Sequence, residues 1–314
     1  MSAVRLASVW QGVTVYVAGH RGLIGSALAT RFRRAGAHVI GWSSGELDLR
    51  DREATMTAVS SIRPDVMVIA AAQVGGIMAN ATYPVDFLND NLRVQTNLFE
   101  AAHAADVPRL LFLGSSCVYP RDAPQPISES ALLTGPLEAT NRSYAVAKIA
   151  GLEAVRAYRQ QYGRSWISAM PTNLYGPRDN FDPVSGHVLP ALIHRFHHAD
   201  DHVVLWGTGA PRREFLFSDD AADALITVLE QYDADEHVNV GTGHDIAISD
   251  LARLIAQTIG FDGSIDWDTS KPDGTPQKRL DVSTLSRLGW HPRTTLAEGI
   301  ATTYRWYLDH GATG

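Results

Sequence analysis

Two side chains suited to acid–base chemistry, Tyr144 and Lys148, stand four positions apart in a stretch that predicts a helix over Ser143–Tyr162. Residues four apart share one helical face, so the phenol and the ammonium should lie close together. A nearby ammonium favours the phenolate, and we therefore expect it to lower the pKa of Tyr144. Such a phenol can protonate a carbonyl oxygen as a hydride arrives, or take the proton back. The pair indicates carbonyl reduction or its reverse.

A second pair of candidate side chains, Ser115 and Cys117, follows the predicted buried strand Arg109–Leu113. Ligands of open α/β sheets bind at the carboxyl ends of strands, which is where this segment begins. Ser115 can hydrogen-bond the same carbonyl as Tyr144, and on an extended segment Cys117 should face the same side as Ser115. A thiolate can act as a base, but a lone buried cysteine is more often a small apolar side chain. The residues alone leave both interpretations of Cys117 open.

A glycine-rich loop stands between a predicted strand, Val13–Ala18, and a predicted helix, Leu23–Ala35. The loop consists of Gly19, His20, Arg21, Gly22, Leu23, Ile24 and Gly25. Its glycines allow a tight turn and a close approach to a pyrophosphate, which the N–H groups at the start of the helix would bind. The spacing is G-x-x-G-x-x-G rather than the commoner G-x-G-x-x-G. We predict a dinucleotide site, with Lys148 also able to hold the nicotinamide ribose.

The residues at the end of the second predicted strand, Ala37–Gly41, help to distinguish an NAD site from an NADP site. An NAD site usually places a carboxylate there to bind the ribose 2′-hydroxyl. This chain has Trp-Ser-Ser-Gly at residues 42–45 instead, and Arg21 in the loop could face a 2′-phosphate. Both observations favour NADP(H) as the cofactor.

The elements that would position these residues alternate between short apolar strands and longer amphipathic helices. Other strands are predicted at Val66–Ala72, Ile167–Pro171 and His237–Val240, and other helices at Pro84–Ala105, Asp219–Tyr232, Asp250–Ile259 (N-cap Ser249, C′ Gly260) and Leu296–Leu308. This pattern predicts an α/β fold with a doubly wound, parallel sheet of the Rossmann type. Glycines and prolines after Gly176 predict a smaller, mixed C-terminal substrate lobe. The Rossmann domain should span residues 1–176 plus about 214–243, and the substrate lobe about 177–213 and 244–314.

Composition excludes several classes of protein. The chain has 314 residues, 45% hydrophobic content and a net charge of −7, which is enough for a large core but lacks the basic surplus of a nucleic-acid binder. One cysteine cannot form an internal disulfide. Residues 1–12 do not resemble a signal peptide, and no apolar run approaches the roughly 18 residues of a spanning helix. We expect a cytoplasmic protein with no membrane or nucleic-acid partner.

Four clustered histidines could suggest a metal site. They are His194, His197, His198 and His202. They fall on or just after a predicted helix, beside two aspartates. We expect them to form a solvated face, and we expect no metal.

Longer stretches around these motifs narrow the interpretation. They read VAGHRG at 17–22, AAAQVGGI at 70–77, LGSSCVYP at 113–120, MPTNLYGP at 170–177 and KPDGTP at 271–276. Together with the glycine loop and the Tyr–Lys pair, they resemble the extended short-chain dehydrogenase/reductase superfamily and, within it, the GDP-L-fucose synthase family. The likeness runs over about residues 13–310. It implies NADPH-dependent 3,5-epimerisation and 4-keto reduction of a GDP-sugar, GDP-4-keto-6-deoxy-D-mannose.

The resemblance also implies roles for individual positions. Catalysis would depend on Ser115, Tyr144 and Lys148 for reduction and on Cys117 and His187 for proton exchange at C3 and C5. The cofactor would contact Gly19, His20, Arg21, Gly22, Leu23, Ile24, Gly25, Leu113, Gly114, Ser115, Ser116, Lys148, Pro171, Thr172, Asn173, Leu174 and His187. The GDP-sugar would contact Arg195, Trp206, Arg213, Asp273 and Lys278. Some family members carry an arginine at the position of Ser44, so NADPH would here depend on Arg21 and the serine hydroxyls.

Alternatives within the superfamily stay open. One is an epimerase/reductase for another GDP- or NDP-4-keto sugar, and another is an NDP-sugar 4-epimerase or a dehydratase. Cys117, two residues beyond Ser115, favours epimerisation over dehydration. An NADP-binding sensor without catalysis would lack a member of the Ser–Tyr–Lys triad, and this chain has all three. Similar enzymes form homodimers through the helices that correspond to Pro84–Ala105 and Ser143–Tyr162, so we expect a homodimer.

Overall fold

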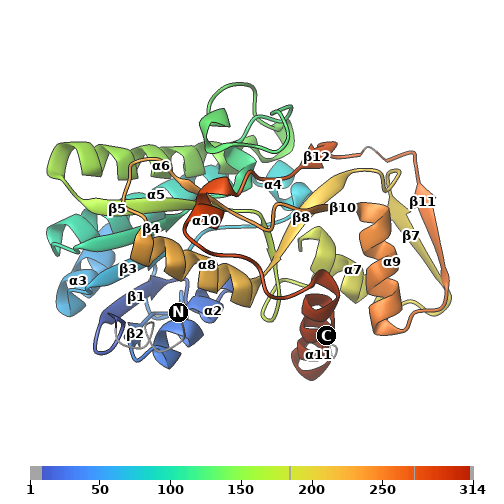
Figure 1. Ribbon diagram of the computed structural model, residues 1–314, viewed down its shortest axis with the longest axis horizontal. Helices are drawn as coiled ribbons and strands as arrows, with labels where there is room; N and C mark the ends of the chain where they lie inside the picture. Colours follow the sequence, from blue (N-terminus) through green and yellow to red (C-terminus); the bar gives the residue numbers. More distant parts are fainter. Residues whose placement is uncertain (1–8, 184, 272, 312–314) are drawn as a thin grey trace.

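A six-stranded parallel sheet forms the centre of the larger lobe in the computed structural model, which describes residues 9–183, 185–271 and 273–311 (Figure 1). Its strands, in spatial order, are β2 (His38–Ile40), β1 (Thr14–Ala18), β3 (Val66–Ile69), β4 (Arg109–Leu113), β5 (Ser165–Pro171) and β9 (Val238–Val240). Every neighbouring pair is parallel. After β1 the chain forms β2 on one side of β1 and then crosses over to form β3 on the other side. The carboxyl ends of β1 and β3 therefore flank a topological switch point, where such sheets bind ligands.

Helices cover both faces of this sheet, as the alternating pattern predicts. On one face α2 (Leu23–Arg34) packs against α8 (Ser218–Gln231). On the other, α5 (Pro84–Ala104) lies between α3 (Arg52–Ile62) and α6 (Arg142–Tyr162). Strands β1, β3, β4 and β5 are buried almost throughout because both faces of the sheet are covered, whereas the edge strand β2 is partly exposed.

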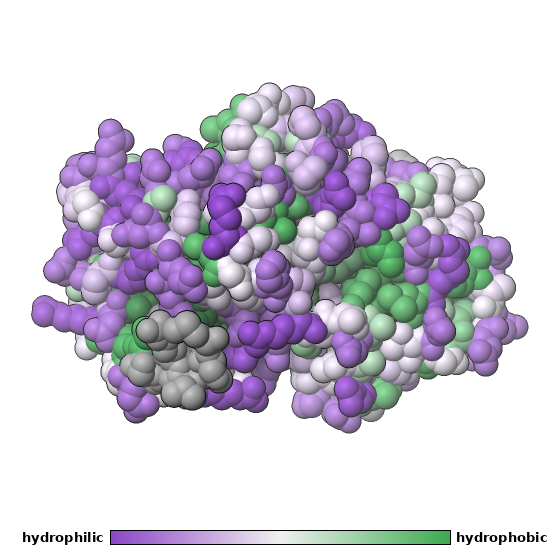
Figure 2. All heavy atoms as spheres, viewed as in Figure 1, coloured by the Kyte–Doolittle hydropathy of each residue, from purple (hydrophilic) through white to green (hydrophobic). Residues whose placement is uncertain are grey.

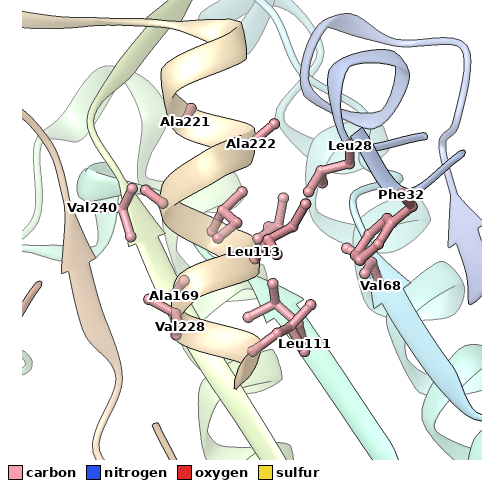
Figure 3. Close-up of a cluster of buried hydrophobic side chains, with 14 of the residues drawn as sticks. Leu28, Phe32, Val68, Leu111, Leu113, Ala169, Ala221, Ala222, Val228 and Val240 are labelled. Atoms are coloured by element: carbon pink, nitrogen blue, oxygen red, sulfur yellow. The ribbon is translucent and has the colours of Figure 1, made fainter. Parts of the chain in front are cut away.

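The core between α2, α8 and the sheet consists mostly of aliphatic side chains, part of which Figure 3 shows, together with the rings of Phe32, Trp10 and Trp290. Leu28 and Phe32 of α2 meet Val68 and Leu111 of the strands, and all four are fully buried. Alanines 221 and 222 of α8 allow that helix to approach the sheet closely. Burial of this kind contributes about 25 cal/mol per Å² of apolar surface, which holds the carboxyl ends of the strands in place.

The smaller lobe is built on a second sheet. Its central strand β8 (Arg212–Phe217) pairs with β6 (Asn173–Tyr175), β10 (Asp245–Ala247) and β12 (Gln277–Lys278). A separate parallel pair joins β7 (His202–Trp206) to β11 (Ser264–Asp268). Helices α7 (Val188–His197), α9 (Ile248–Ile259) and α11 (Leu296–His310) pack around a third core. Two further helices are short: α4 (Ile77–Thr82) and α10 (Ser283–Arg287).

Two local expectations need correction. Residues 214–217 belong to the second sheet through β8, whereas we expected them in the Rossmann domain. Helix α9 begins at Ile248 and is preceded by Ala247, so Ser249 lies inside the helix rather than at its N-cap. Its C-terminal residue is followed by left-handed Gly260, as expected. The division of the chain into two domains at the boundaries given above stays a prediction.

The surface seen in Figure 2 is largely hydrophilic, with apolar atoms gathered mostly over the smaller lobe. None of the helices in the described ranges is both long enough and apolar enough to cross a bilayer.

Candidate active site

The glycine loop forms a tight turn between β1 and α2. Gly19 has a left-handed backbone (φ +87°), and a Cβ built there would lie 2.8 Å from the backbone nitrogen of Ala71, just after β3. A Cβ on Gly25 would overlap the carbonyl oxygen of Gly19. Gly22 precedes α2 without a side-chain cap, and the first turn of α2 has no acidic residue. The first N–H groups of α2 are thus available to an anion, and this cradle fits a dinucleotide pyrophosphate.

Arg21, the residue that we expect to bind the 2′-phosphate of NADP, lies beside Glu46. Its Nη2 is 3.7 Å from Oε2 of Glu46, and both side chains are exposed. The same Glu46 oxygen accepts hydrogen bonds from the Ser43 backbone nitrogen (2.7 Å) and hydroxyl (2.6 Å). These hydrogen bonds, helped by the charge of Arg21, lower the pKa of Glu46. The predicted phosphate site therefore holds an arginine and a serine hydroxyl around one carboxylate.

A pocket of about 390 Å³ opens beside the same loop. Three arginines line it, Arg21, Arg33 and Arg178, together with Asp219. It lies at the glycine loop rather than at the Tyr–Lys pair. Its basic lining suits cofactor phosphates rather than a reacting carbonyl.

Tyr144 and Lys148 share one face of α6, as predicted. The Lys148 Nζ is 5.9 Å from the centre of the Tyr144 ring and donates a 2.8 Å hydrogen bond to the carbonyl oxygen of Leu113, the last residue of β4. Burial lowers the pKa of Lys148 to about 7. Burial also raises the pKa of Tyr144. Our expectation of a lowered tyrosine pKa is wrong, because desolvation of the buried phenol is the largest influence on its ionisation.

Ser115 and Cys117 lie beside Tyr144, but not on an extended segment as we expected. Residues 116–118 form a 3₁₀ turn, in which the Val118 backbone nitrogen donates to the Ser115 carbonyl oxygen (3.1 Å) and the Cys117 backbone nitrogen donates to the Ser115 hydroxyl (3.3 Å). A hydrogen bond with Ser115 lowers the pKa of Tyr144 and partly offsets its burial, whereas the charge of Cys117 adds to the rise. Ser115, Cys117 and Tyr144 are therefore brought together at the carboxyl end of β4.

Asn141 is a residue of this cluster that the sequence analysis missed. It ends a 3₁₀ turn (Ala139–Asn141) and immediately precedes α6. Its Nδ2 donates a hydrogen bond to Sγ of Cys117 over 3.2 Å, while its Oδ1 is buried and has no hydrogen-bond partner. The signal in the sequence was its place three residues before Tyr144, but a contact with Cys117, 24 positions away, follows only from the fold.

His187 is the residue that precedes α7, and its side chain does not cap that helix. The segment before it is tied to the Rossmann domain, because the Gly76 backbone nitrogen donates to the carbonyl oxygen of Ser185 over 2.9 Å. Surrounding protein lowers the pKa of His187 by desolvation, although the residue remains solvent-accessible. No hydrogen bond or ring contact in the described residues joins His187 to Cys117 or Tyr144.

The segment Pro171–Leu174 runs from β5 into β6 and connects the two sheets. The Thr172 backbone nitrogen donates to the carbonyl oxygen of Val240 in β9 (2.9 Å), and the Asn173 side chain donates to the carbonyl oxygen of Glu214 in β8 (2.7 Å). Glu214 is fully buried, and its carboxylate accepts hydrogen bonds from the backbone nitrogens of Gly243 (2.7 Å) and Leu280 (2.8 Å). No pattern in the sequence predicts this junction, because its hydrogen bonds join residues that are far apart in the chain.

Two predicted substrate cations lie side by side in the second sheet. Arg213 of β8 is in register with Lys278 of β12, and Lys278 is buried. Burial lowers the pKa of Arg213, an effect that the nearby Cys117 and Glu138 oppose. Arg213 is thus close enough to Cys117 to join the cluster around Tyr144.

Other predicted substrate residues form a group on β7 and its neighbours. The guanidinium of Arg195 lies 5.9 Å from the Trp206 ring, and the Lys271 ammonium lies 5.8 Å from it. Trp206 is 55% exposed, so one aromatic face with two cations is open to a ligand. Asp273 accepts hydrogen bonds from the Thr208 backbone nitrogen (2.9 Å) and hydroxyl (2.7 Å), which pin the turn after β7. Pro272, within the Lys271–Pro276 motif, lies outside the described residues.

The clustered histidines are partly solvated, as expected, since His198 and His202 are exposed and His194 and His197 are half-buried, but three of them also bind tyrosine side chains. His194 and His198 both hydrogen-bond the buried hydroxyl of Tyr307 in α11 (2.9 and 3.1 Å), and His197 bonds Tyr304 (3.0 Å). The amphipathic helix α7 therefore packs its histidines against α11. Among described residues, no three His, Cys, Asp or Glu side chains are grouped as metal ligands.

Comparison with known proteins gives a consistent result. The model of the NAD dependent epimerase/dehydratase family matches residues 15–241. GDP-L-fucose synthase 1 of Arabidopsis thaliana is 51% identical over 301 residues, covering 94% of this chain and 93% of that protein. GDP-L-fucose synthase of Escherichia coli K12 is 48% identical over 312 residues, covering 94% and 97%. A crystal structure of a GDP-L-fucose synthetase from Naegleria fowleri bound to NADP superposes with a TM-score of 0.88 at 30% identity, covering 97% of this chain and 96% of that one.

Proposed function

Because the chain belongs to the NAD dependent epimerase/dehydratase family and, within it, to the GDP-L-fucose synthases, we propose that it converts GDP-4-keto-6-deoxy-D-mannose to GDP-L-fucose with NADPH. The observation that carries this proposal is the convergence of Ser115, Cys117 and Tyr144 beside Lys148 at the carboxyl end of β4. A thiol in that cluster suits proton exchange next to a ketone. The 48–51% identity to GDP-L-fucose synthases supports this sugar over another keto sugar.

Epimerisation needs a base, an acid and a group that stabilises an enolate. The C4 ketone acidifies the hydrogens on C3 and C5, so one base–acid pair can invert both centres in turn. We assign Cys117 as the base that removes the proton, leaving its electron pair in the enolate, and His187 as the acid that protonates the other face. The hydroxyls of Ser115 and Tyr144 donate to the enolate oxygen.

Reduction completes the reaction at the same carbonyl. NADPH, when bound, supplies a hydride to C4. Burial raises the pKa of Tyr144, so the side chain is a phenol at neutral pH and can protonate the new alkoxide. Lys148 is held by the Leu113 carbonyl within reach of the ring, where it also suits the ribose hydroxyls.

Binding of the two nucleotides is divided between the lobes. For the cofactor we assign the glycine loop, residues 113–116 and 171–174, Lys148 and His187. For the GDP-sugar we assign the diphosphate to Arg213 and Lys278, because a guanidinium and a buried ammonium adjoin there, and the purine to Trp206 with Arg195. Asp273 supports the turn after Trp206 through Thr208.

We also propose a homodimer in the cytoplasm, where nucleotide sugars and NADPH are available. Helices α5 and α6 pack side by side on an outer face, and Val85 and Val146 are exposed on them. Two copies would join these pairs into a four-helix interface. Sedimentation at micromolar concentration should give the dimer mass; a monomer would exclude this interface, and fractionation of cells tests the compartment.

The function is tested by following the reaction in D₂O with NMR. The chain should consume NADPH, incorporate deuterium at C3 and C5 and release GDP-L-fucose. Cys117→Ser should slow the exchange about a hundredfold or more, since a hydroxyl replaces the proposed general base, while NADPH binding, followed by its fluorescence, stays unchanged. Undiminished exchange at both carbons in the variant would rule out the role of Cys117.

A further inference from the structure

Asn141 donates a hydrogen bond to the sulfur of Cys117, but its other amide atom has no partner. The amide nitrogen of Asn141 points its hydrogen at the sulfur over 3.2 Å, and the amide oxygen on the other side is buried without a partner. A buried, unpartnered acceptor destabilises a fold, so such groups are rare and often belong to functional sites. Replacement of Asn141 by an apolar residue would remove this destabilising group. Folding alone therefore gives no reason for an asparagine here.

The chemistry of the sulfur supplies a reason. A hydrogen bond from a neutral N–H is much stronger to an anion than to a neutral acceptor. An amide donor on the Cys117 sulfur, such as Asn141, would therefore bind a thiolate more strongly than a thiol. Arg213, whose guanidinium is electrostatically coupled to Cys117, acts in the same direction.

The position of Asn141 also fixes where the sulfur lies. Asn141 directly precedes α6, which carries Tyr144, while Cys117 lies in the turn after β4. The hydrogen bond therefore joins the two segments whose side chains must act on one sugar ring.

We propose that Asn141 is a positioning residue that holds the Cys117 sulfur as a thiolate beside the Tyr144 hydroxyl, ready to remove protons from the substrate. This inference rests on the proposed function for its role in catalysis. Its physical core, an amide that promotes ionisation of the thiol, can be tested without any substrate.

The test uses the only cysteine of the chain as its own reporter. Iodoacetamide reacts with the thiolate, so its rate of reaction with Cys117, measured across pH, reports the ionised fraction. In Asn141→Ala the rate of alkylation at pH 7 should fall roughly fourfold. The ionised fraction of Cys117 should fall about tenfold, but a more basic sulfur is a better nucleophile, which partly offsets this loss. The plateau rate at high pH should not fall. Asn141→Asp should react more slowly still at pH 7, since a carboxylate repels the thiolate.

The stability of the variants distinguishes a role of Asn141 in positioning Cys117 from a purely structural role. Asn141→Ala should unfold at the same denaturant concentration as the parent chain or a higher one, because the unpartnered oxygen is lost. The matched control is Asn97→Ala in α5, which removes a buried amide that donates to the Leu49 carbonyl oxygen (2.9 Å). It should lower stability and leave the alkylation profile unchanged.

The role of Asn141 in catalysis is measured by deuterium exchange at C3 and C5 of the substrate. Asn141→Ala should slow this exchange about fivefold or more, without a comparable loss of NADPH binding. An unchanged alkylation profile in both Asn141 variants would overturn the proposal, even if the chain makes GDP-L-fucose. A shifted profile in a chain that fails to make GDP-L-fucose would support the proposal's physical core and contradict the proposed function instead.

Discussion

At the scale of single residues, burial rather than neighbouring charge decides the protonation of the central groups. Desolvation raises the pKa of Tyr144 and lowers that of Lys148 to about 7, although the two side chains face each other. The phenol is thereby kept as a proton donor, which is the form that reduction of a ketone requires. The spacing of Tyr144 and Lys148 predicted their shared face, but the sign of the tyrosine shift depends on the surrounding atoms that the fold supplies.

Cofactor selectivity also belongs to this scale. Arg21 is the cation that we expect to bind the 2′-phosphate, and it forms an ion pair with Glu46. Arg21→Ala should raise the KM for NADPH about tenfold, roughly the effect of one charge-assisted hydrogen bond, and leave the KM for NADH nearly unchanged. Steady-state kinetics with both cofactors measures the ratio. Glu46→Gln is the matched variant and should shift the ratio towards NADPH; equal effects on both cofactors would exclude Arg21 as the discriminating residue.

At the scale of elements, the sequence predicts the parts that follow strong periodic patterns and misses those set by long-range contacts. The glycine loop, α2, α6 and the six strands of the main sheet follow from apolar runs and glycine spacing. Strand β8 was not predicted because its partners, β6, β10 and β12, come from distant, short segments. The 3₁₀ turn at Cys117 is held by local hydrogen bonds to the hydroxyl and the carbonyl oxygen of Ser115, and no periodic pattern predicts such a turn.

The junction of these elements can be tested at Glu214. Its buried carboxylate joins the turns after β9 and β12 to β8, so it fixes the strand that carries Arg213. Glu214→Gln should lower the free energy of unfolding by about 1–3 kcal/mol, because an amide NH₂ would face at least one backbone N–H. Urea unfolding measures this loss. Glu153→Gln, at an exposed ion pair with Arg156, should change stability very little; a similar loss in both variants would contradict the proposed junction.

At the scale of the whole molecule, the stability of the fold should depend on pH through Asp179. Burial raises the pKa of this carboxyl from 3.8 to about 7, and its Oδ2 is buried without a partner. A raised folded-state pKa means that its stabilising contribution is complete below pH 3.8 and is lost as the pH rises through about 7. The parent chain should therefore lose stability over this interval.

Asp179→Asn removes this titration and keeps an acceptor for the Asn180 backbone nitrogen. Its melting temperature should exceed that of the parent chain by a few degrees at pH 8, and the difference should shrink towards pH 4. Thermal melts followed by circular dichroism at several pH values measure this trend. The exposed Asp262→Asn serves as the control. A gain that is the same at every pH would show that ionisation of Asp179 is not its cause.

The bare start of helix α2 has a consequence for the lifetime of the protein. Gly22 offers no side chain to the first N–H groups, so water must solvate them until a phosphate replaces it. Occupancy by a dinucleotide then adds its binding free energy to the folded state. Resistance to heat and to proteases should therefore track the concentration of free cofactor, and a cell depleted of it would clear this enzyme sooner.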